Sequence, residues 1–191
     1  MRRALLFFAA ALLVAGCATG TDAVTHGGTF EFVTPGGKTD IFYDPPASRG
    51  TVGTLAGDSV TEPGTTVSLA GYPDQAVVLN VWGSWCGPCR SEAADLVRVA
   101  GATSAQRVQF VGIDVRDSQQ AGADFARDFG LSYPSIFDPP GRTLLALNGV
   151  PRSVVPLTII LDRHHRVAAV FLHAIHAQDL QPVVQRIAAE A

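Results

Sequence analysis

The sequence lacks the features that mark several common classes of protein. It has no basic excess, since 14 lysines and arginines stand against 17 acidic residues and give a formal net charge of −3. This balance argues against nucleic acid or an anionic membrane surface as a partner. There is no long charge run, low-complexity tract or coiled-coil repeat, so the composition indicates a globular chain. Its 191 residues suffice for one domain with appendages.

The sequence also has no hydrophobic run long enough to span a bilayer comfortably. The apolar stretch near its start covers Ala4 to Ala15 and follows the short basic start Met1-Arg2-Arg3. A basic start and an apolar run of this length are typical of a signal peptide rather than of a membrane-spanning helix.

The end of this apolar stretch indicates a lipid anchor. Val14-Ala15-Gly16-Cys17 looks like a bacterial lipobox. We therefore expect residues 1–16 to be a lipoprotein signal peptide, Cys17 to be lipidated, and residues 17–28 to tether an extracytoplasmic domain to the cell membrane. The alternatives are ordinary secretion with Cys17 incidental, or an uncleaved anchor.

Cysteine is scarce, and two of the three cysteines lie in Trp85-Cys86-Gly87-Pro88-Cys89. A zinc site usually needs a second ligand pair, and the sequence has neither another C-x-x-C nor an H-x-x-x-H. A structural bridge that closes so short a loop would add little stability. The motif follows an apolar run and precedes a helical pattern, a context that predicts a redox-active dithiol.

The order of the residues predicts which sulfur attacks. Pro88 suits the first turn of a helix, where a missing N–H is tolerated. Cys86 then lies at the N-terminus of that helix, where the helix dipole and free N–H groups favour a thiolate. We predict that Cys86 is exposed and attacks a disulfide, and that Cys89 resolves the mixed disulfide.

The run from Asn80 to Glu92, N-V-W-G-S-W-C-G-P-C-R-S-E, resembles the thioredoxin superfamily and in particular its extracytoplasmic TlpA/ResA branch. The resemblance implies an α/β thioredoxin-like fold, with a central mixed β-sheet flanked by helices and an inserted helix and strand. We place this domain at residues 66–191, after an N-terminal β extension at 29–65. The extension is expected to cover a sheet edge, with partner docking as the alternative.

Alternation and turn residues predict the elements. We expect a hairpin of 29–33 with 39–43 around Pro35-Gly36-Gly37, and a strand near 52–55. The remaining expected strands are 66–69, 77–82, 107–115, 134–138, the run 153–162 that Pro156 opens, and 167–172. The expected helices are 87–100, 119–129, 141–147 and 178–189. Asp114, Arg116 and Asp117 either form a capped turn, which we favour, or line the approach to the active site.

Glu92 is the candidate proton carrier. Thioredoxins usually place a buried Asp beneath the cysteines, and this sequence has Asn80 there. Glu92 lies one helical turn after Cys89, on the apolar stripe, where burial would raise its pKa toward neutrality. TlpA/ResA-like proteins use a Glu at this offset to shuttle protons. The alternative is a surface Glu paired with Arg90 or Arg98.

The resemblance also implies a substrate groove. The superfamily places a cis-proline opposite the cysteines, and the Val155–Pro156 bond is the candidate here. The alternative is an ordinary trans-proline at the start of a strand. The groove would combine Val155 and Pro156 with Trp85, Gly87 and Pro88.

These features predict a thiol-disulfide oxidoreductase that acts on protein thiols and disulfides, with no metal and no cofactor beyond the redox-active disulfide. By resemblance, we expect it to reduce apocytochrome c cysteines during cytochrome c maturation. Its electrons would come from a membrane donor of the CcdA/DsbD type. The alternatives are a disulfide-forming oxidase or isomerase for secreted proteins, and a tethered binding module with an inert disulfide.

Overall fold

The computed structural model describes residues 28–190. The predicted signal peptide, the predicted lipidation site Cys17 and the predicted tether up to residue 27 lie outside the described residues. None of the helices within 28–190 has the length and apolar character required to traverse a bilayer.

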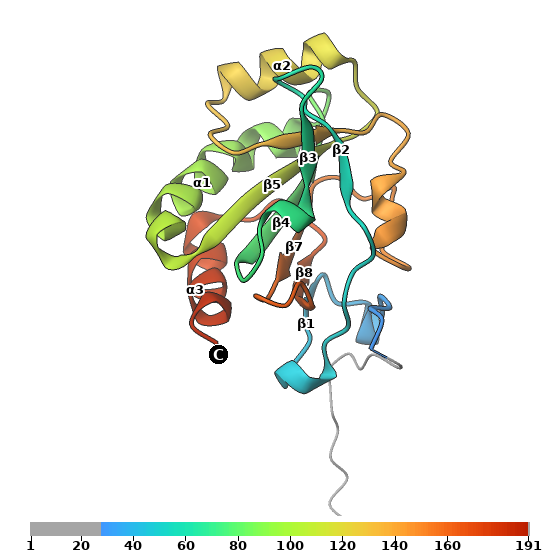
Figure 1. Cartoon of the computed structure of the whole chain (residues 1–191), viewed down its shortest axis with the longest axis vertical. Helices are drawn as coiled ribbons and strands as arrows, with labels where there is room; N and C mark the ends of the chain where they lie inside the picture. The colour runs from blue at the N-terminus through green and yellow to red at the C-terminus, as the bar shows by residue number, and fades with distance from the viewer. Residues whose placement is uncertain (1–27, 191) are drawn as a thin grey trace, which may run out of the picture.

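The centre of the described chain is a mixed sheet in the strand order β1-β8-β7-β4-β5-β6 (Figure 1). β4, β5 and β6 run parallel, whereas β7, β8 and β1 are joined by antiparallel pairings. Every residue of β4 is buried, as expected for a strand covered on both faces. The strands are β1 (Asp40–Phe42), β4 (Ala76–Trp82), β5 (Val108–Asp114), β6 (Ser135–Phe137), β7 (Leu157–Leu161) and β8 (Val167–Phe171).

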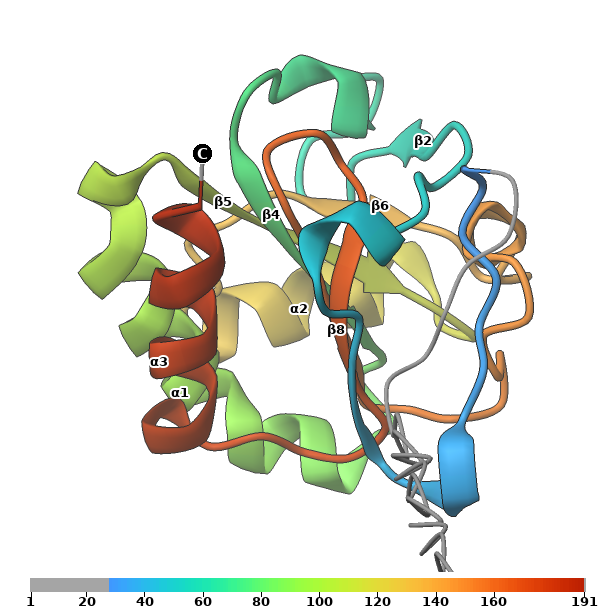
Figure 2. The same ribbon diagram turned by 90° about the horizontal axis from the view of Figure 1, so that it is seen from below.

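Helices α1 (Gly87–Thr103) and α3 (Ala177–Ala188) pack side by side on one face of the sheet (Figure 2). Helix α2 (Gln119–Asp128) follows β5 and stacks Phe125 on Trp82 of β4, with ring centroids 4.7 Å apart. The three predicted long helices are thus present. Short 3-10 helices lie at Pro35–Gly37, Pro46–Ser48, Leu69–Gly71, Ser104–Gln106 and Thr143–Ala146.

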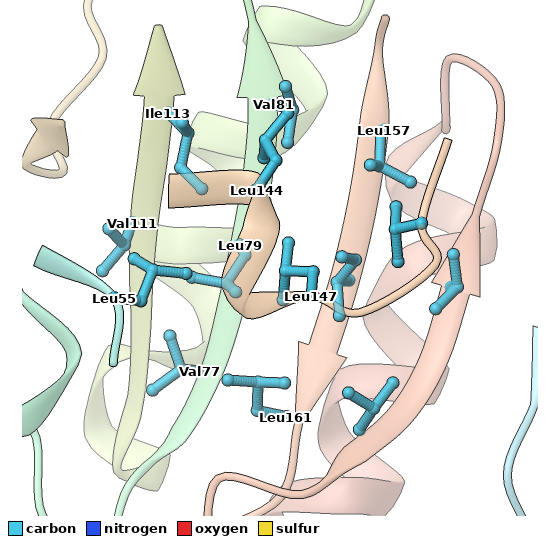
Figure 3. Close-up of a cluster of buried hydrophobic side chains, with 14 of the residues drawn as sticks. Leu55, Val77, Leu79, Val81, Val111, Ile113, Leu144, Leu147, Leu157 and Leu161 are labelled. Atoms are coloured by element: carbon cyan, nitrogen blue, oxygen red, sulfur yellow. The ribbon is translucent and has the colours of Figure 1, made fainter. Parts of the chain in front are cut away.

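The opposite face of the sheet buries a large aliphatic cluster (Figure 3). Leu79 of β4 and Leu157 of β7 project into it from the strands, and Leu144 and Leu147 cover them from the segment around the last 3-10 helix. Leu55, from the N-terminal part of the chain, packs into the same cluster. The N-terminal extension is therefore part of the core.

The N-terminal extension covers both edges of the central sheet. β1 pairs with β8 at one edge, and Ser59 bridges to Ile136 of β6 at the other. Next to β6, β2 (Ala56–Asp58) of the extension pairs with β3 (Thr66–Ser68) in a small second sheet. The predicted edge-covering role of the extension is confirmed. Its residues form hydrogen bonds with backbone groups of β8 and β6 that would otherwise be exposed at an open edge.

The predicted N-terminal hairpin is wrong, because its two arms pair with other parts of the chain. The N–H of Phe30 donates to the carbonyl of Thr51, whereas the second arm becomes β1 and pairs with β8. Phe30 and Tyr43 still meet edge to face at 5.4 Å, both almost fully buried. Pairing with β8 at the edge of the central sheet gives the second arm more backbone hydrogen bonds and more burial than a local hairpin would.

The strand expected near residues 52–55 is also displaced, to β2 at Ala56–Asp58. Leu55 is used for the core instead, with its side chain almost fully buried. Gly57 permits β2 to lie against β6, since a Cβ on Gly57 would come within 2.5 Å of Ile136 Cγ2. A glycine within a short strand can thus mark a close contact rather than a strand end.

A buried arginine ties the N-terminal extension to the end of the chain. The Arg49 side chain is fully buried and pairs with Asp44 at 2.7 Å, with Asp162 at 3.4 Å and with Glu190. Its Nε also donates to the Tyr43 carbonyl at 2.8 Å. Burial alone would lower the pKa of Arg49, but the hydrogen bonds to Glu190 and Asp44 raise it above its ordinary value.

We expect Arg49→Met to destabilise the protein by about 3 kcal/mol, because it removes a buried cation that pairs with all three of these carboxylates. Urea unfolding of the matched variants measures this. Arg186→Met is the control, since Arg186 pairs with Asp44 and Glu190 from an exposed position and should change stability by less than about 1 kcal/mol. Equal effects of the two substitutions would contradict the assignment.

Candidate functional site

The two cysteines lie at the start of α1 and are joined by a disulfide. Cys86 is the N-cap residue of the helix, in an extended conformation, and its Sγ accepts the N–H of Cys89 at 3.2 Å. The helix begins with Gly87 and Pro88, both of them exposed. The sulfur of Cys86 therefore lies where the helix N-terminus would stabilise a thiolate once the bridge is reduced.

The predicted exposure of Cys86 is wrong for the oxidised protein. Cys86 and Cys89 are each only 2 % exposed, and they pack in a cluster with Trp82, Ala93 and Phe125. Val155 packs on the same cluster and remains partly exposed. The sequence shows that the cysteines follow a buried strand, but the depth of the disulfide depends on contacts from distant segments.

The loop before Cys86 is held by several contacts from the end of β5. Trp85, 46 % exposed, donates its Nε1–H to the Val115 carbonyl at 3.0 Å, and the Arg116 guanidinium lies 4.4 Å from its ring centroid. The Ser84 N–H donates to Asp117 Oδ2 at 2.6 Å. Arg116 and Asp117 therefore contact the loop before Cys86, whereas Asp114 is buried and does not line the approach. The favoured capped turn is also present, and its cap is the side chain of Ser118.

Glu92 is buried as predicted, with 1 % exposure. Its Oε1 accepts Asn80 Nδ2 at 2.9 Å and its Oε2 accepts the Ile175 N–H at 2.9 Å. Burial raises the pKa of Glu92 to about 7, against the opposing effect of the hydrogen bonds from Ile175 and Asn80. The alternative of an ion pair with Arg90 or Arg98 is excluded, because Arg90 binds the Ser84 carbonyl and Arg98 binds Asp95.

The Val155–Pro156 peptide bond is cis, as predicted. Pro156 is buried immediately before β7, while Val155 packs beside the cysteine cluster. A second cis bond, Asp44–Pro45, was not predicted; it precedes the segment that carries Arg49. The predicted site residues Trp85, Gly87, Pro88 and Val155 thus surround the disulfide with partly exposed groups, whereas the sulfurs themselves lie below.

Sequence reasoning missed the packing beneath the disulfide. Val60 and Phe125 join Trp82 there, although they come from the extension and from α2. Trp82 lies so close to β5 that a Cβ on Gly112 would be 2.6 Å from its Nε1 and 2.2 Å from Ser135 Oγ. The glycine inside the predicted strand was the available signal for this close approach.

This arrangement can exchange a disulfide and move a proton. A dithiol at a helix N-terminus supplies a stabilised thiolate, and a buried acid three residues after Cys89 has a pKa near neutrality. The exposed Trp85 and the partly exposed Val155 offer apolar contacts around the disulfide. The site therefore has the groups that thiol-disulfide exchange requires: two cysteines at a helix N-terminus and a buried acid.

Comparison with known proteins agrees with this geometry. The model of the AhpC/TSA family matches residues 54–170. The thiol-disulfide oxidoreductase ResA of Geobacillus kaustophilus is 28 % identical over 119 residues, which are 62 % of this chain and 67 % of the relative.

Two solved structures share the fold at higher identity. A secreted thiol-disulfide isomerase from Corynebacterium glutamicum superposes with a TM-score of 0.82 and 46 % identity, over 86 % of this chain and all of that one. A DsbF homologue from Corynebacterium diphtheriae has a TM-score of 0.78 and 51 % identity, over 83 % of this chain and 99 % of that one. The expected thioredoxin-like α/β fold is thereby confirmed.

Proposed function

We propose that this chain, which belongs to the AhpC/TSA family and is a thiol-disulfide oxidoreductase, reduces disulfides of extracytoplasmic proteins. It would do so from a membrane anchor at Cys17. The observation that carries the reductive direction is the Gly87-Pro88 pair between cysteines at a helix N-terminus. Thioredoxin, which has such a motif, is a reductant with a potential of about −270 mV.

The reaction follows from the two sulfurs. The Cys86 thiolate attacks one sulfur of the substrate disulfide, forms a mixed disulfide and releases the other substrate sulfur as a thiolate. Cys89 then gives up its proton to the Glu92 carboxylate and attacks Cys86, which frees the second substrate thiol and re-forms the Cys86–Cys89 bridge. Two electrons from an external donor must reduce the bridge before the next cycle.

The proposed substrate is apocytochrome c, whose cysteines must be reduced before haem attachment, and the proposed donor is a membrane protein of the CcdA/DsbD type. The resemblance to the TlpA/ResA branch and the similarity to ResA support both. A dithiol outside the cytoplasm faces an oxidising environment, so a reducing role needs such a donor.

A second candidate function is the isomerisation or formation of disulfides in secreted proteins. The specific observation in its favour is the 46 % identity to a protein described as a secreted thiol-disulfide isomerase, higher than the identity to ResA. For disulfide formation, the Cys86–Cys89 bridge would take two electrons from a pair of substrate thiols and would then be reoxidised by an external oxidant. For isomerisation, a reduced Cys86 thiolate would attack a substrate disulfide and be released when the substrate sulfurs pair again.

The reduction potential of the Cys86–Cys89 pair separates the two functions. We expect a potential of about −270 mV, like that of thioredoxin, and efficient reduction of insulin in the presence of dithiothreitol. Equilibration with glutathione or thioredoxin mixtures measures the potential. A value near the roughly −120 mV of a strong oxidase, with native bridges formed in reduced, unfolded ribonuclease, would instead establish the second function.

A further inference from the structure

Asp114 is a buried carboxyl that the exchange reaction does not use. It ends β5 beside Trp82 of β4 and has no exposed surface. Helix α2 approaches it so closely that a Cβ on Gly122 would lie 2.2 Å from Asp114 Oδ2. Among residues 28–190, no N–H or O–H group donates to either of its side-chain oxygens. A buried carboxylate without donors is strongly disfavoured.

The group that meets the Asp114 carboxyl is a second carboxyl, that of Asp117. Both oxygens of Asp117 already accept backbone hydrogens, Oδ2 from Ser84 at 2.6 Å and Oδ1 from Ser118 at 2.9 Å. Asp117 is therefore an acceptor in its other contacts. Two acceptors can form a hydrogen bond only if one of them carries a proton, and Asp114 is the one shielded from water.

We propose that Asp114 keeps its proton and donates it to Asp117, so that the two carboxyls form a positioning device for the active-site loop Gly83–Cys86. The bond fixes Asp117, and Asp117 in turn fixes the backbone N–H of Ser84, two residues before Cys86. The adjacent residues Val115 and Arg116 hold Trp85 from the same turn. This role is independent of the direction in which electrons flow.

The electrostatics of the site agree with a proton on Asp114 at neutral pH. Burial raises the pKa of Asp114 to about 8, and the charge of Asp117 adds to the effect. Trp82 of β4 and Gly122 of α2, which lie against it, do not ionise. Asp138 donates its backbone N–H to the Asp114 carbonyl, and its own carboxylate accepts from Arg142 and Thr143. Arg116, the nearest residue of opposite charge in the turn, has its guanidinium over Trp85.

The test follows the backbone amide of Ser84 by NMR in the oxidised protein, whose disulfide cysteines do not titrate. A Glu92→Gln background removes the other buried acid of the site. We expect the Ser84 amide shift to change in a single step with a midpoint near pH 8, as two like charges come to face each other. In Asp114→Asn the step should be absent, because the amide of Asn donates to Asp117 at every pH.

Two further variants make the result decisive. Asp128→Asn, at an exposed acid of α2, should leave the step unchanged. Asp117→Asn keeps an oxygen for Ser84 but removes the like charge, so the midpoint should fall; this variant serves if Asp114→Asn does not fold. A Ser84 amide that is flat between pH 7 and 9 in the parent, or an unchanged step in Asp114→Asn or Asp117→Asn, would overturn the proposal.

Discussion

Glu92→Gln is expected to slow disulfide turnover by about 10² to 10⁴ and, in the same molecule, to stabilise the fold at alkaline pH. The rate falls because Gln cannot accept the proton of Cys89. The geometry can survive: Asn80 can turn its amide so that its oxygen accepts from the introduced Gln side chain, while Ile175 still donates to the remaining Gln oxygen. The loss of rate would therefore report the proton rather than a rearranged site.

The stability gain follows from the raised pKa of Glu92. The folded pKa is about 7 and the ordinary value is 4.5, so between these the folded state binds the proton that the unfolded chain has lost. Stability therefore falls as pH rises from about 4.5 to 7, and the full penalty remains above pH 7. At about 1.4 kcal/mol per pKa unit the penalty is at most about 3.5 kcal/mol, and Gln removes it.

Two measurements check this prediction. Urea unfolding should show the variant more stable than the parent at pH 8 and about equal at pH 4.5, while insulin reduction should lose its inflection near pH 7. Glu62→Gln, an exposed acid outside the site, is the matched control and should alter neither property. A variant with the parent's rate and pH profile would leave Glu92 a structural acid.

Local patterns made the chemistry of the site predictable. The C-x-x-C spacing, the proline in the first helical turn and the helical period place Cys86 at the N-cap and turn Glu92 inward. Each of these features depends on residues within one or two turns of each other. The cis bond before Pro156 was predictable only through the family resemblance, because prolines in general favour trans.

Contacts between distant segments were not predictable in the same way. The extension pairs with β8 and β6 rather than forming the predicted local hairpin, and Arg49 contacts acids at positions 44, 162 and 190. Neither pairing leaves a periodic signal in the sequence. The contact of Asp117 with Ser84 likewise joins residues 33 positions apart. The sequence around Asp117 alone therefore cannot distinguish a residue that only forms a turn from one that also contacts the active-site loop.

The burial of Cys86 has a consequence for substrate entry. With 2 % of the oxidised residue exposed, an incoming thiolate must reach the sulfur past partly exposed neighbours such as Val155, which packs on the cysteine cluster. A substrate chain that pairs with the backbone beside Pro156 would lie over this position. Selectivity can then come from how well a substrate displaces these contacts, in addition to the chemistry of its disulfide.

Cys89→Ala is expected to abolish turnover and to leave substrate proteins covalently attached to Cys86. Without the resolving thiol, the mixed disulfide formed by attack of Cys86 has no intramolecular route to release. In cells that express the variant, non-reducing gels followed by mass spectrometry should show reducible adducts. Apocytochrome c among them would support reduction in cytochrome c maturation, and secreted proteins with structural disulfides would support the second function.

Cys86→Ala is the matched control, since it keeps Cys89 buried on α1 and removes the attacking sulfur. It should lose turnover equally but trap nothing. Combining Cys89→Ala with Cys17→Ala should move the adducts from the membrane fraction to the soluble fraction if Cys17 carries the lipid. Adducts on Cys89 in Cys86→Ala would reverse the roles of the sulfurs, and no adducts in either variant would indicate an inert disulfide, because attack would then never have begun.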